Sequence, residues 1–338
     1  MNKLLILLII ATLFLNGVGV TEAGSSSRWE KRSEPVFSGD LIASDPAILR
    51  DGAIYRMFYT CWIPGEDHFR SAICQATSAD GFAWTNIPTD GSIAGLVLRG
   101  RDGEWDEHLE ASFVVKHESE YLLYYSGYGN EGVPAMGYPA ALAVAKSTDG
   151  VNFERVEDGP IIQPTPGWLD NDAVYSPTIY EEDGQLVMIY AGHCYTTCNA
   201  GYGVNLLGAR SNDGVHWIKE TQPVLQAIDG LEWTRDGVAE PGIVIGPDGF
   251  LYLFFTGLLD EQRAIGVARG ESLLGPWDVI PDPIIVPSPN GFDAGGALAP
   301  DVHIEGNLAR MWFLGFDTAG DIAIGYAETI WPFWENAG

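Results

Sequence analysis

Residues 44–60, SDPAILRDGAIYRMFYT, read as a short apolar strand, a tight Asp-Gly turn and a second strand rich in aromatic residues. The pattern returns four times, in EASFVVKHESEYLLYYSG from Glu110, YSPTIYEEDGQLVMIYAG from Tyr175, AEPGIVIGPDGFLYLFFTG from Ala239 and APDVHIEGNLARMWFLG from Ala299. If Asp45, Ser112, Ser176, Glu240 and Ala299 are equivalent, the copies lie 67, 64, 64 and 59 residues apart. A repeat of this size with two strands per copy predicts a propeller or a similar array of stacked units.

Each copy continues with a third strand and, in most copies, a fourth. The fourth strand follows a W-x5-P register in WIKETQPV (217–224) and WDVIPDPI (277–284), and the last copy ends without one. The same register occurs at the other end of the chain, in WEKRSEPVF (29–37). We therefore expect an all-β fold, a five-bladed β-propeller with four antiparallel strands per blade, whose ring is closed by the N-terminal strand.

Three turns share a motif after the third strand, in SADGFAW (78–84), STDGVNF (147–153) and SNDGVHW (211–217). The Asp-Gly pair supplies the turn, and the aromatic residue three positions after the glycine can fold back onto the blade. We interpret these turns as structural.

The N-terminus has the features of a secretory signal. Lys3 precedes a 12-residue apolar run, LLILLIIATLFL, which is too short for an ordinary membrane span, and small residues lead to Ala23. We predict a signal peptide over residues 1–23, a single propeller domain over 24–338, and a secreted or periplasmic protein. An uncleaved anchor is the alternative.

Charge and cysteine content limit the partners and the compartment. A net charge of −28 argues against nucleic acid or an anionic membrane surface, and we expect a monomer with no membrane partner after cleavage. Export makes disulfides plausible, and we predict the pairs Cys61–Cys74 and Cys194–Cys198. A cysteine metal site is the poorer interpretation because neither pair has CxxC spacing.

Propeller geometry places two sets of side chains on one face of the ring. The starts of the first strands contribute Asp45, Glu110, Asp172, Ser176, Glu240, Asp301 and His303. The loops after the second strands contribute Trp62, His68, Tyr128, His193, Tyr195, Asp260 and Asp317. Buried acids are costly to gather unless they bind cations or exchange protons, so this face is the predicted site. No P-loop, G-x-G-x-x-G, H-E-x-x-H or G-x-S-x-G motif is present, which argues against nucleotide cofactors and serine-triad chemistry.

With its Asp-Pro in the first copy, Glu-Pro in the fourth and S-x-D-G turns, the chain resembles the five-bladed glycoside hydrolases of families 43, 32, 68, 117 and 130. These are enzymes of the arabinanase, invertase and levansucrase type, and family 43 is the expected match. The resemblance implies that Asp45 is base or nucleophile and Glu240 the general acid. The position of the third acid in such enzymes is occupied here by Ser176, which has no carboxylate. Asp172, Asp301 and Glu110 are the candidates to supply that carboxylate.

Further roles follow from the same resemblance. His193 and His303 would lie near a cation or water below the sugar, and a structural Ca²⁺ in the channel would relieve the crowding of acids. We expect no required cofactor. Trp62, Tyr128 and Tyr195, with Tyr138 and Tyr202, are the candidates for contact with a carbohydrate, together with Glu110 and Ser176.

The predicted function is therefore hydrolysis of glycosidic bonds in a polysaccharide or its oligosaccharides by paired carboxylates. A separation of about 6.5–9.5 Å between the two would indicate inversion, and about 5–5.5 Å retention. A sugar-binding propeller without activity is one alternative, to which Ser176 gives weight. A glycoside phosphorylase or transferase is the other, and it would need cations at the channel mouth, for which Arg70, Arg101, Arg235 and Arg263 are the candidates.

Overall fold

The structure is a computed structural model that describes residues 29–38, 42–63, 70–89, 93–129, 140–195 and 203–334. Its regular elements are β-strands, apart from the 3-10 helix η1 (Glu232–Thr234). The predicted signal peptide lies outside the described residues, as do His68, Tyr138, Cys198 and Tyr202. No helix in the described part is long and apolar enough to cross a membrane.

The strands pair into five antiparallel units of four, within the part of the chain that is described. Unit 1 contains β2 (Ala43–Asp51), β3 (Ile54–Ile63), β4 (Arg70–Ser78) and β5 (Thr85–Asn86), with β6 (Leu96–Leu98) also beside β4. Unit 2 contains β7 (His108–His117), β8 (Glu120–Tyr128), β9 (Ala141–Ser147) and β10 (Glu154–Arg155). Unit 3 contains β11 (Ala173–Glu182), β12 (Gln185–Cys194), β13 (Gly203–Ser211) and β14 (Ile218–Lys219).

Two further units complete the chain. Unit 4 contains β15 (Gly237–Ile245), β16 (Leu251–Leu259), β17 (Gln262–Gly270) and β18 (Asp278–Val279). Unit 5 contains β19 (Gly296–Glu305), β20 (Leu308–Phe316), β21 (Ile322–Ile330) and, from the other end of the chain, β1 (Glu30–Lys31). Glu30 pairs with Glu328 and Lys31 with Ala327, in the antiparallel register that the W-x5-P motif predicts.

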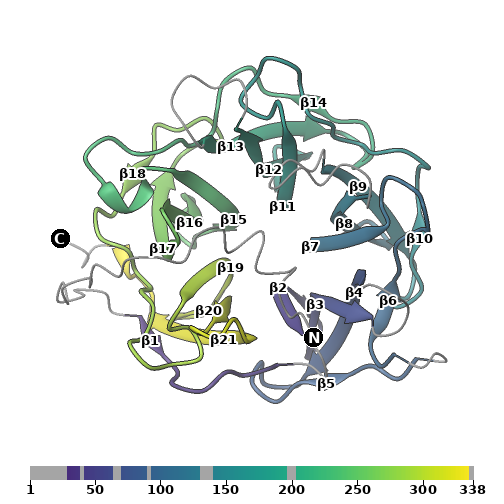
Figure 1. Ribbon diagram of the computed structural model, residues 1–338, viewed down its shortest axis with the longest axis horizontal. Helices are drawn as coiled ribbons and strands as arrows, with labels where there is room; N and C mark the ends of the chain where they lie inside the picture. The colour runs from purple at the N-terminus through teal and green to yellow at the C-terminus, as the bar shows by residue number, and fades with distance from the viewer. Residues whose placement is uncertain are drawn as a thin grey trace.

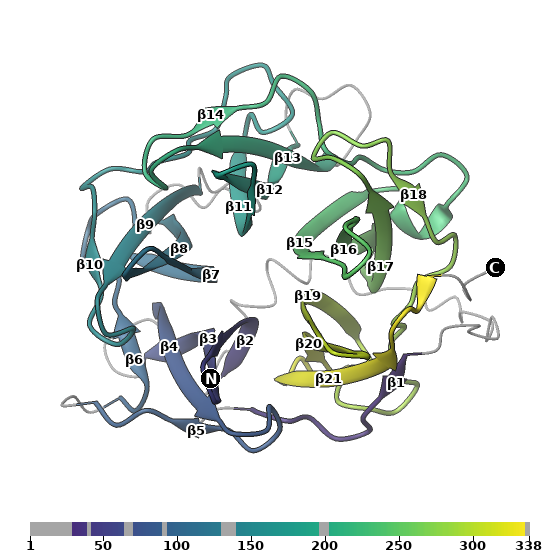
Figure 2. The ribbon, with the colours of Figure 1, turned by 180° about the vertical axis from the view of Figure 1, so that it is seen from behind.

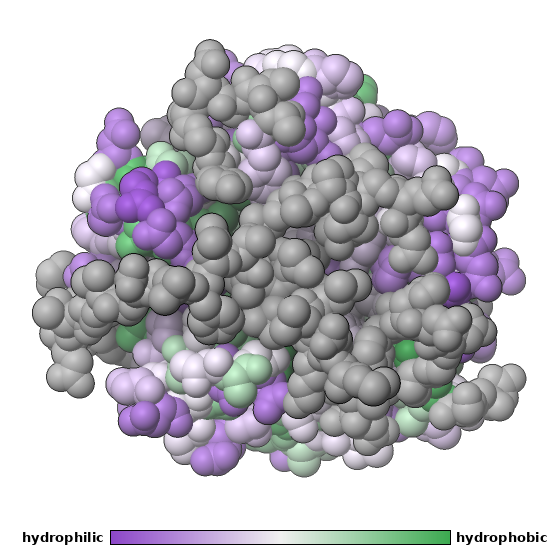
Figure 3. Space-filling model, in the orientation of Figure 1, coloured by the Kyte–Doolittle hydropathy of each residue, from purple (hydrophilic) through white to green (hydrophobic). Residues whose placement is uncertain are grey.

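The units lie around a central axis in chain order, in the manner of a propeller (Figures 1 and 2). The first strand of each unit, that is β2, β7, β11, β15 or β19, lies nearest the axis, and the short fourth strands lie at the outside (Figure 1). Units 3 and 4 also share one parallel pair, Val204 with Gly237. Hydrophilic residues, purple in Figure 3, cover much of the outer part of the face shown there.

A β-bulge interrupts the same point of every first strand. The pairing register shifts between Ser44 and Ala47 in unit 1, and at the matching place in the other four units. One residue in each bulge has a left-handed backbone, with φ between 46° and 51°, and these residues are Asp45, Ala111, Ser176, Glu240 and Ala299. The expectation that Ser112 is the unit 2 equivalent is therefore wrong by one position, because only Ala111 shares the bulge conformation.

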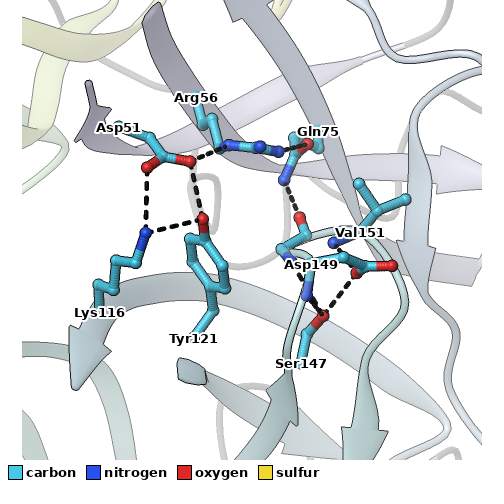
Figure 4. Close-up of polar contacts among 9 residues, drawn as sticks. Asp51, Arg56, Gln75, Lys116, Tyr121, Ser147, Asp149 and Val151 are labelled. Atoms are coloured by element: carbon cyan, nitrogen blue, oxygen red, sulfur yellow. Dashed lines mark hydrogen bonds and ion pairs between the residues drawn. The ribbon is translucent and has the colours of Figure 1, made fainter. Parts of the chain in front are cut away.

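The Asp-Gly turns join neighbouring units, as a structural role requires. The Trp312 indole donates a 2.9 Å hydrogen bond to the Gly81 carbonyl, Gln75 bonds Gly150 at 2.7 Å, and Tyr124 bonds Gly214 at 3.0 Å. In each case the donor belongs to the preceding unit of the ring. Figure 4 shows the Gln75 contact beside two ion pairs of Asp51, one with Arg56 of the same unit and one with Lys116, which links units 1 and 2. The aromatic residue also folds back as predicted, since the Trp84 indole bonds the Gly81 carbonyl at 3.1 Å.

A buried ion pair ties the entry of a first strand to the fourth strand of the same unit. Asp106 bonds Arg155 at 2.7 Å in unit 2, and Asp170 bonds Lys219 at 2.5 Å in unit 3. Asp293 bonds Lys31 in unit 5. All three aspartate side chains are fully buried. Lys31 therefore makes in unit 5 the contact that the local fourth strand makes in units 2 and 3.

Unit 4 replaces both partners of this pair together. Thr234 stands where the other units have aspartate, and Val279 where they have lysine or arginine. The Thr234 hydroxyl accepts the Ile228 amide at 3.0 Å, just as Asp170 accepts the Thr165 amide at 3.1 Å. Unit 4 thus keeps the hydrogen bond to the backbone amide but has neither charge of the ion pair.

One of the two predicted disulfides is present. Cys61 at the end of β3 bonds Cys74 in β4, with the Cα atoms 5.7 Å apart. Cys194 is also disulfide-bonded, and its predicted partner, Cys198, lies outside the described residues.

Candidate active site

A cavity lies where the five bulges meet. Its lining includes all five bulge residues, together with the prolines that follow four of them. The polar groups on its wall are the side chains of Asp45, Ser176, Glu240 and Asp301, with Ser112 beside them. Three first strands of different units, β2, β15 and β19, therefore bring three of the predicted acids to one place.

The bulge explains why an Xaa-Pro dipeptide marks these positions. Proline has no N–H to lose from the ladder, so it is tolerated at a bulge, and the residue before it is turned out of the strand. A left-handed backbone costs a residue with a side chain about 1–3 kcal/mol, and such strain concentrates at functional sites. Glycine at position 242, two residues after Glu240, is required by space, because a Cβ there would lie 2.2 Å from the Pro300 carbonyl oxygen.

Asp45 is the acid with the most strongly perturbed protonation. Burial raises its pKa from 3.8 to about 7, and the nearby charges of Glu110 and Glu240 add to this effect. Hydrogen bonds from Ser44 and Thr60 oppose it, with the Ser44 hydroxyl 2.8 Å from Oδ2. In the ligand-free protein Asp45 therefore holds its proton to near neutral pH.

Glu240 also has a raised pKa, and burial is again the main cause. Three groups oppose the shift, namely the Thr256 hydroxyl, the Arg263 guanidinium and the Ala299 amide. Arg263 is the arginine whose charge lowers the pKa of Glu240. Arg235 instead forms ion pairs at 2.8–3.0 Å with acids outside the cavity. The two carboxyl groups thus have different electrostatic surroundings. A nearby cation favours the ionised form of Glu240, whereas two nearby anions disfavour the ionised form of Asp45.

Glu110 is fixed by two tyrosines from different units. Tyr128 from β8 donates to its Oε1 and Tyr175 from β11 donates to its Oε2, both at 2.5 Å. Tyr128 stacks between His108 and Tyr175, with ring centroids 4.9 and 6.4 Å apart. The Tyr128 ring is thereby enclosed by protein, so its place in the structure is that of a support for Glu110. Sequence reasoning missed Tyr175, although this residue opens the third repeat.

Asp301 and His303 both bind the backbone of β2. Asp301 accepts the Ile48 amide, and His303 Nε2 lies 2.9 Å from the Ile48 carbonyl oxygen. Burial raises the pKa of Asp301, while His303 and backbone amides oppose the rise. This pair connects units 5 and 1. Asp301 lines the cavity, and one of its carboxylate oxygens makes a structural hydrogen bond.

Asp172 lies at the rim, in the turn before β11. Its carboxylate accepts the Tyr195 amide and the Asn171 side-chain amide, the latter at 2.7 Å. His193 is bonded through Nδ1 to the Tyr195 hydroxyl at 2.5 Å, and burial lowers the pKa of His193 to about 4. The imidazole is therefore neutral at physiological pH. These residues form a cluster beside the cavity, while Trp62 lies half-buried near the end of β3.

Among the described residues, no three His, Cys, Asp or Glu side chains gather closely enough to hold a metal ion. Asp301 lines the cavity, and one of its carboxylate oxygens accepts the Ile48 amide. A structural calcium in the channel stays a prediction.

Comparisons with known proteins agree with this architecture. Residues 111–259 match the family described as glycosyl hydrolases family 32 N-terminal domain. A solved glycoside hydrolase shares the fold with a TM-score of 0.71 at 18% identity, over 88% of this chain and 92% of that chain. Residues 111–259 thus resemble family 32 glycoside hydrolases in sequence, and the chain shares its fold with solved glycoside hydrolases.

Proteins similar to this chain differ in chemistry. A solved structure from a family of mannoside phosphorylases that contains glycoside hydrolases has a TM-score of 0.62 at 17% identity, over 88% of each chain. A sucrose-6-phosphate hydrolase of Zymomonas mobilis is 27% identical over 125 residues, 37% of this chain and 20% of the hydrolase. The matching family model is that of family 32, one of the families expected from the sequence beside family 43.

An uncharacterized protein of Mycobacterium tuberculosis is also similar to this chain. The two are 27% identical over 204 residues, which are 56% of this chain and 60% of that protein. The matched region therefore spans less than two thirds of these curated relatives. These similarities are consistent with a glycosidase-type enzyme, and a shared fold does not by itself fix the reaction.

Proposed function

We propose that the protein is an exported glycoside hydrolase that cleaves a polysaccharide or its oligosaccharides with Asp45 and Glu240. The observation that carries the proposal is the meeting of these two acids in one cavity, from bulges at equivalent points of units 1 and 4. Burial raises the pKa of both, which is the property a general acid requires. Two carboxyl groups flanking a glycosidic bond suffice for its hydrolysis.

The chemistry needs one carboxyl group protonated and the other ionised. In the proposed roles Glu240 protonates the leaving oxygen while Asp45 attacks the sugar or activates water. The productive form is a minority in the ligand-free protein, because Asp45 keeps its proton to about pH 7 and three groups favour ionised Glu240. Loss of this last proton, which Asp45 mainly holds, removes the productive form, so we expect the alkaline limb of kcat/KM near pH 7.

The proposal includes export and a closed ring. The apolar N-terminal run and the Cys61–Cys74 disulfide support an oxidising compartment. The five units, with β1 as the fourth strand of unit 5, support a ring of five blades joined by its first and last strands. The protein would act as a monomer on a carbohydrate.

The test is activity of the disulfide-bonded protein on aryl glycosides and polysaccharides, for wild type, Asp45→Asn and Glu240→Gln. Loss of acid–base catalysis typically lowers rates about 10²–10⁴-fold, and we expect losses of this size for both variants. Glu240→Gln should lose less on a dinitrophenyl glycoside than on a natural linkage, since that leaving group needs no proton. Asp45→Asn should lose equally on both.

Glu118→Gln is the matched control, because Glu118 is exposed in the turn between β7 and β8 and should keep full activity. An inert wild type whose melting temperature rises with a glycan would instead identify a sugar-binding propeller. Equal activity of wild type and both cavity variants would contradict the assignment of the two acids.

A phosphorylase is the second candidate, and Arg263 favours it. Its guanidinium acts on Glu240 and donates to the carbonyl oxygens of Asp260 and Gln262, each at 2.8–2.9 Å. The other arginines considered, Arg70, Arg101 and Arg235, form ion pairs with carboxylates. Adding inorganic phosphate to the assays separates the two reactions, because a phosphorylase would release a sugar phosphate and a hydrolase would not.

A further inference from the structure

A hydroxyl group recurs at the seam between neighbouring units. It belongs to the second-strand residue that pairs with the residue just before the bulge, and it is Thr60 in unit 1, Ser126 in unit 2 and Thr256 in unit 4. Each accepts the bulge amide of the next unit at 3.0 Å, that of Ala111, Ser176 and Ala299 respectively. Units 3 and 5 have Ala191 and Leu314 there, which carry no hydroxyl.

Thr256 does more than bridge two units. While its Oγ1 accepts the Ala299 amide, its own proton is donated to Glu240 Oε2 at 2.7 Å. The Ala299 amide also reaches Glu240 Oε2, at 3.1 Å. Since the amide occupies a lone pair of the hydroxyl, the hydroxyl proton is directed to the carboxylate. Thr256 is fully buried, so no water competes for that proton.

These contacts make the two oxygens of Glu240 unequal. Within the described structure, both hydrogen bonds that reach this carboxylate end on Oε2. A proton held by Glu240 therefore belongs on Oε1, the oxygen left for exchange with a bound molecule. The same holds if Glu240 acts as a base, because Oε1 is then the oxygen with free lone pairs.

Unit 1 repeats the arrangement around Asp45. The Thr60 hydroxyl accepts the Ala111 amide and forms a hydrogen bond that lowers the pKa of Asp45. Unit 2 is the natural contrast, since Ser126 bridges to Ser176 while its own bulge residue is Ala111, which has no carboxylate. Threonine thus stands at the seam in both units whose bulge carries an acid.

We propose that Thr256 is a positioning residue for Glu240, which holds Oε2 in place and leaves Oε1 as the reacting oxygen. The inference rests on the proposed function for its catalytic meaning, but the hydrogen bonds to Glu240 exist with or without a reaction. Thr60 would serve Asp45 in the same way. The other charged groups that act on the pair are Arg263 on Glu240 and Glu110 on Asp45.

The test is Thr256→Val in the full, disulfide-bonded chain, beside Thr256→Ser. Valine keeps the shape but removes the donor, and the Ala299 amide retains Glu240 as acceptor. We expect the pKa of Glu240, followed by carboxyl-carbon NMR against a Glu240→Gln reference, to rise by roughly one pH unit. With an active substrate, kcat should fall about tenfold while the acid limb of the pH profile moves upward. Thr256→Ser should restore both.

Ser126→Ala is the matched control, because it removes a seam hydroxyl that bonds no carboxylate, and the pKa of Glu240 should not change. Equal pKa values in wild type and Thr256→Val would overturn the proposal. So would an equal shift in Ser126→Ala, since the effect would then belong to the seam in general. If valine prevents folding, Thr256→Ala is measured in its place. A shifted pKa in a protein without glycosidase activity would support the positioning role and reject the proposed function.

Discussion

At the scale of single residues, the site is defined by acids held in strained positions. Asp45 and Glu240 each occupy a left-handed backbone position before a proline, with φ of 51° and 50°. A smaller or more flexible residue would fit such a position at lower cost. Burial then places both carboxyl groups where ionisation is unfavourable, so the chain tolerates strain and desolvation at the same two residues.

Glu110 is the neighbour through which this balance can be tested. Its charge is the largest charge effect on Asp45, second to burial, and Tyr128 and Tyr175 hold it in place. Glu110→Gln removes that charge and keeps the shape. The negative charge of Glu110 disfavours the ionised form of Asp45. Its removal should therefore lower the pKa of Asp45 below its value of about 7. The alkaline limb of kcat/KM should move to lower pH by about one unit.

Asp172→Asn is the comparison for this prediction. Asp172 is also near the rim, yet its carboxylate binds the Tyr195 amide and it is not among the groups that shift Asp45. The alkaline limb should therefore stay in place in Asp172→Asn. If Asp172→Asn moved the limb and Glu110→Gln did not, Asp172 would be the acid that acts on Asp45.

At the scale of strands, the units are tied internally by buried charges. The pairs Asp106–Arg155, Asp170–Lys219 and Asp293–Lys31 each join the entry of a first strand to the fourth strand. A buried carboxylate that loses its partner is strongly destabilising, whereas removal of both charges can be nearly neutral. Unit 4 contains the uncharged form of the contact, in Thr234 and Val279.

The uncharged form can be transferred to unit 3. Lys219→Val leaves the fully buried Asp170 without its cation, and we expect the free energy of unfolding to fall by about 3–5 kcal/mol. The double variant Asp170→Thr, Lys219→Val copies unit 4 and should recover most of that loss. Chemical denaturation followed by tryptophan fluorescence measures both values. A double variant less stable than Lys219→Val would show that the charges themselves are needed.

At the scale of the whole molecule, the first and last described strands, β1 and β21, pair in unit 5. Lys31 pairs with Ala327 in β21 and binds Asp293, while Trp29 packs on Phe254 and Phe333 with ring centroids 5.9 and 5.5 Å apart. A two-residue strand has little pairing energy of its own. The buried ion pair and the tryptophan are therefore the main contacts that hold the first strand to the last unit.

Lys31→Val tests whether this strand closes the ring. We expect β1 to detach before the rest unfolds, because Asp293 becomes an unpaired buried charge. Trypsin should then cleave after Arg32, which in the intact structure lies over the Phe82 ring at 3.9 Å. Mass spectrometry of native digests detects this cut. Lys219→Val is the control, and cleavage after Arg32 in that variant as well would mean that any weakened unit exposes β1.

The repeat and the register of its strands were readable from the sequence, because alternation, Asp-Gly turns and the W-x5-P spacing are local properties. Sequence reasoning also selected Asp45 and Glu240, through the resemblance that their Xaa-Pro dipeptides carry, and both line the cavity, while their catalytic roles stay a prediction. It misplaced the unit 2 equivalent by one residue, where Ala111 is followed by serine and the dipeptide is absent. It also missed Tyr175, Thr60 and Thr256, although counting the hairpin register back from each turn would have located the two threonines.

Only the tertiary structure decided which acids face the cavity and how each is supported. Asp172 and Asp301 look equivalent to Glu110 in sequence, but they bind backbone amides, whereas Glu110 acts on Asp45. Such partners come from units about 65 residues apart along the chain, and a carboxylate's pKa depends on burial and on charges within a few ångströms. The sequence by itself therefore determined the repeating fold and the two principal acids, while the protonation and orientation of those acids arise from contacts between units.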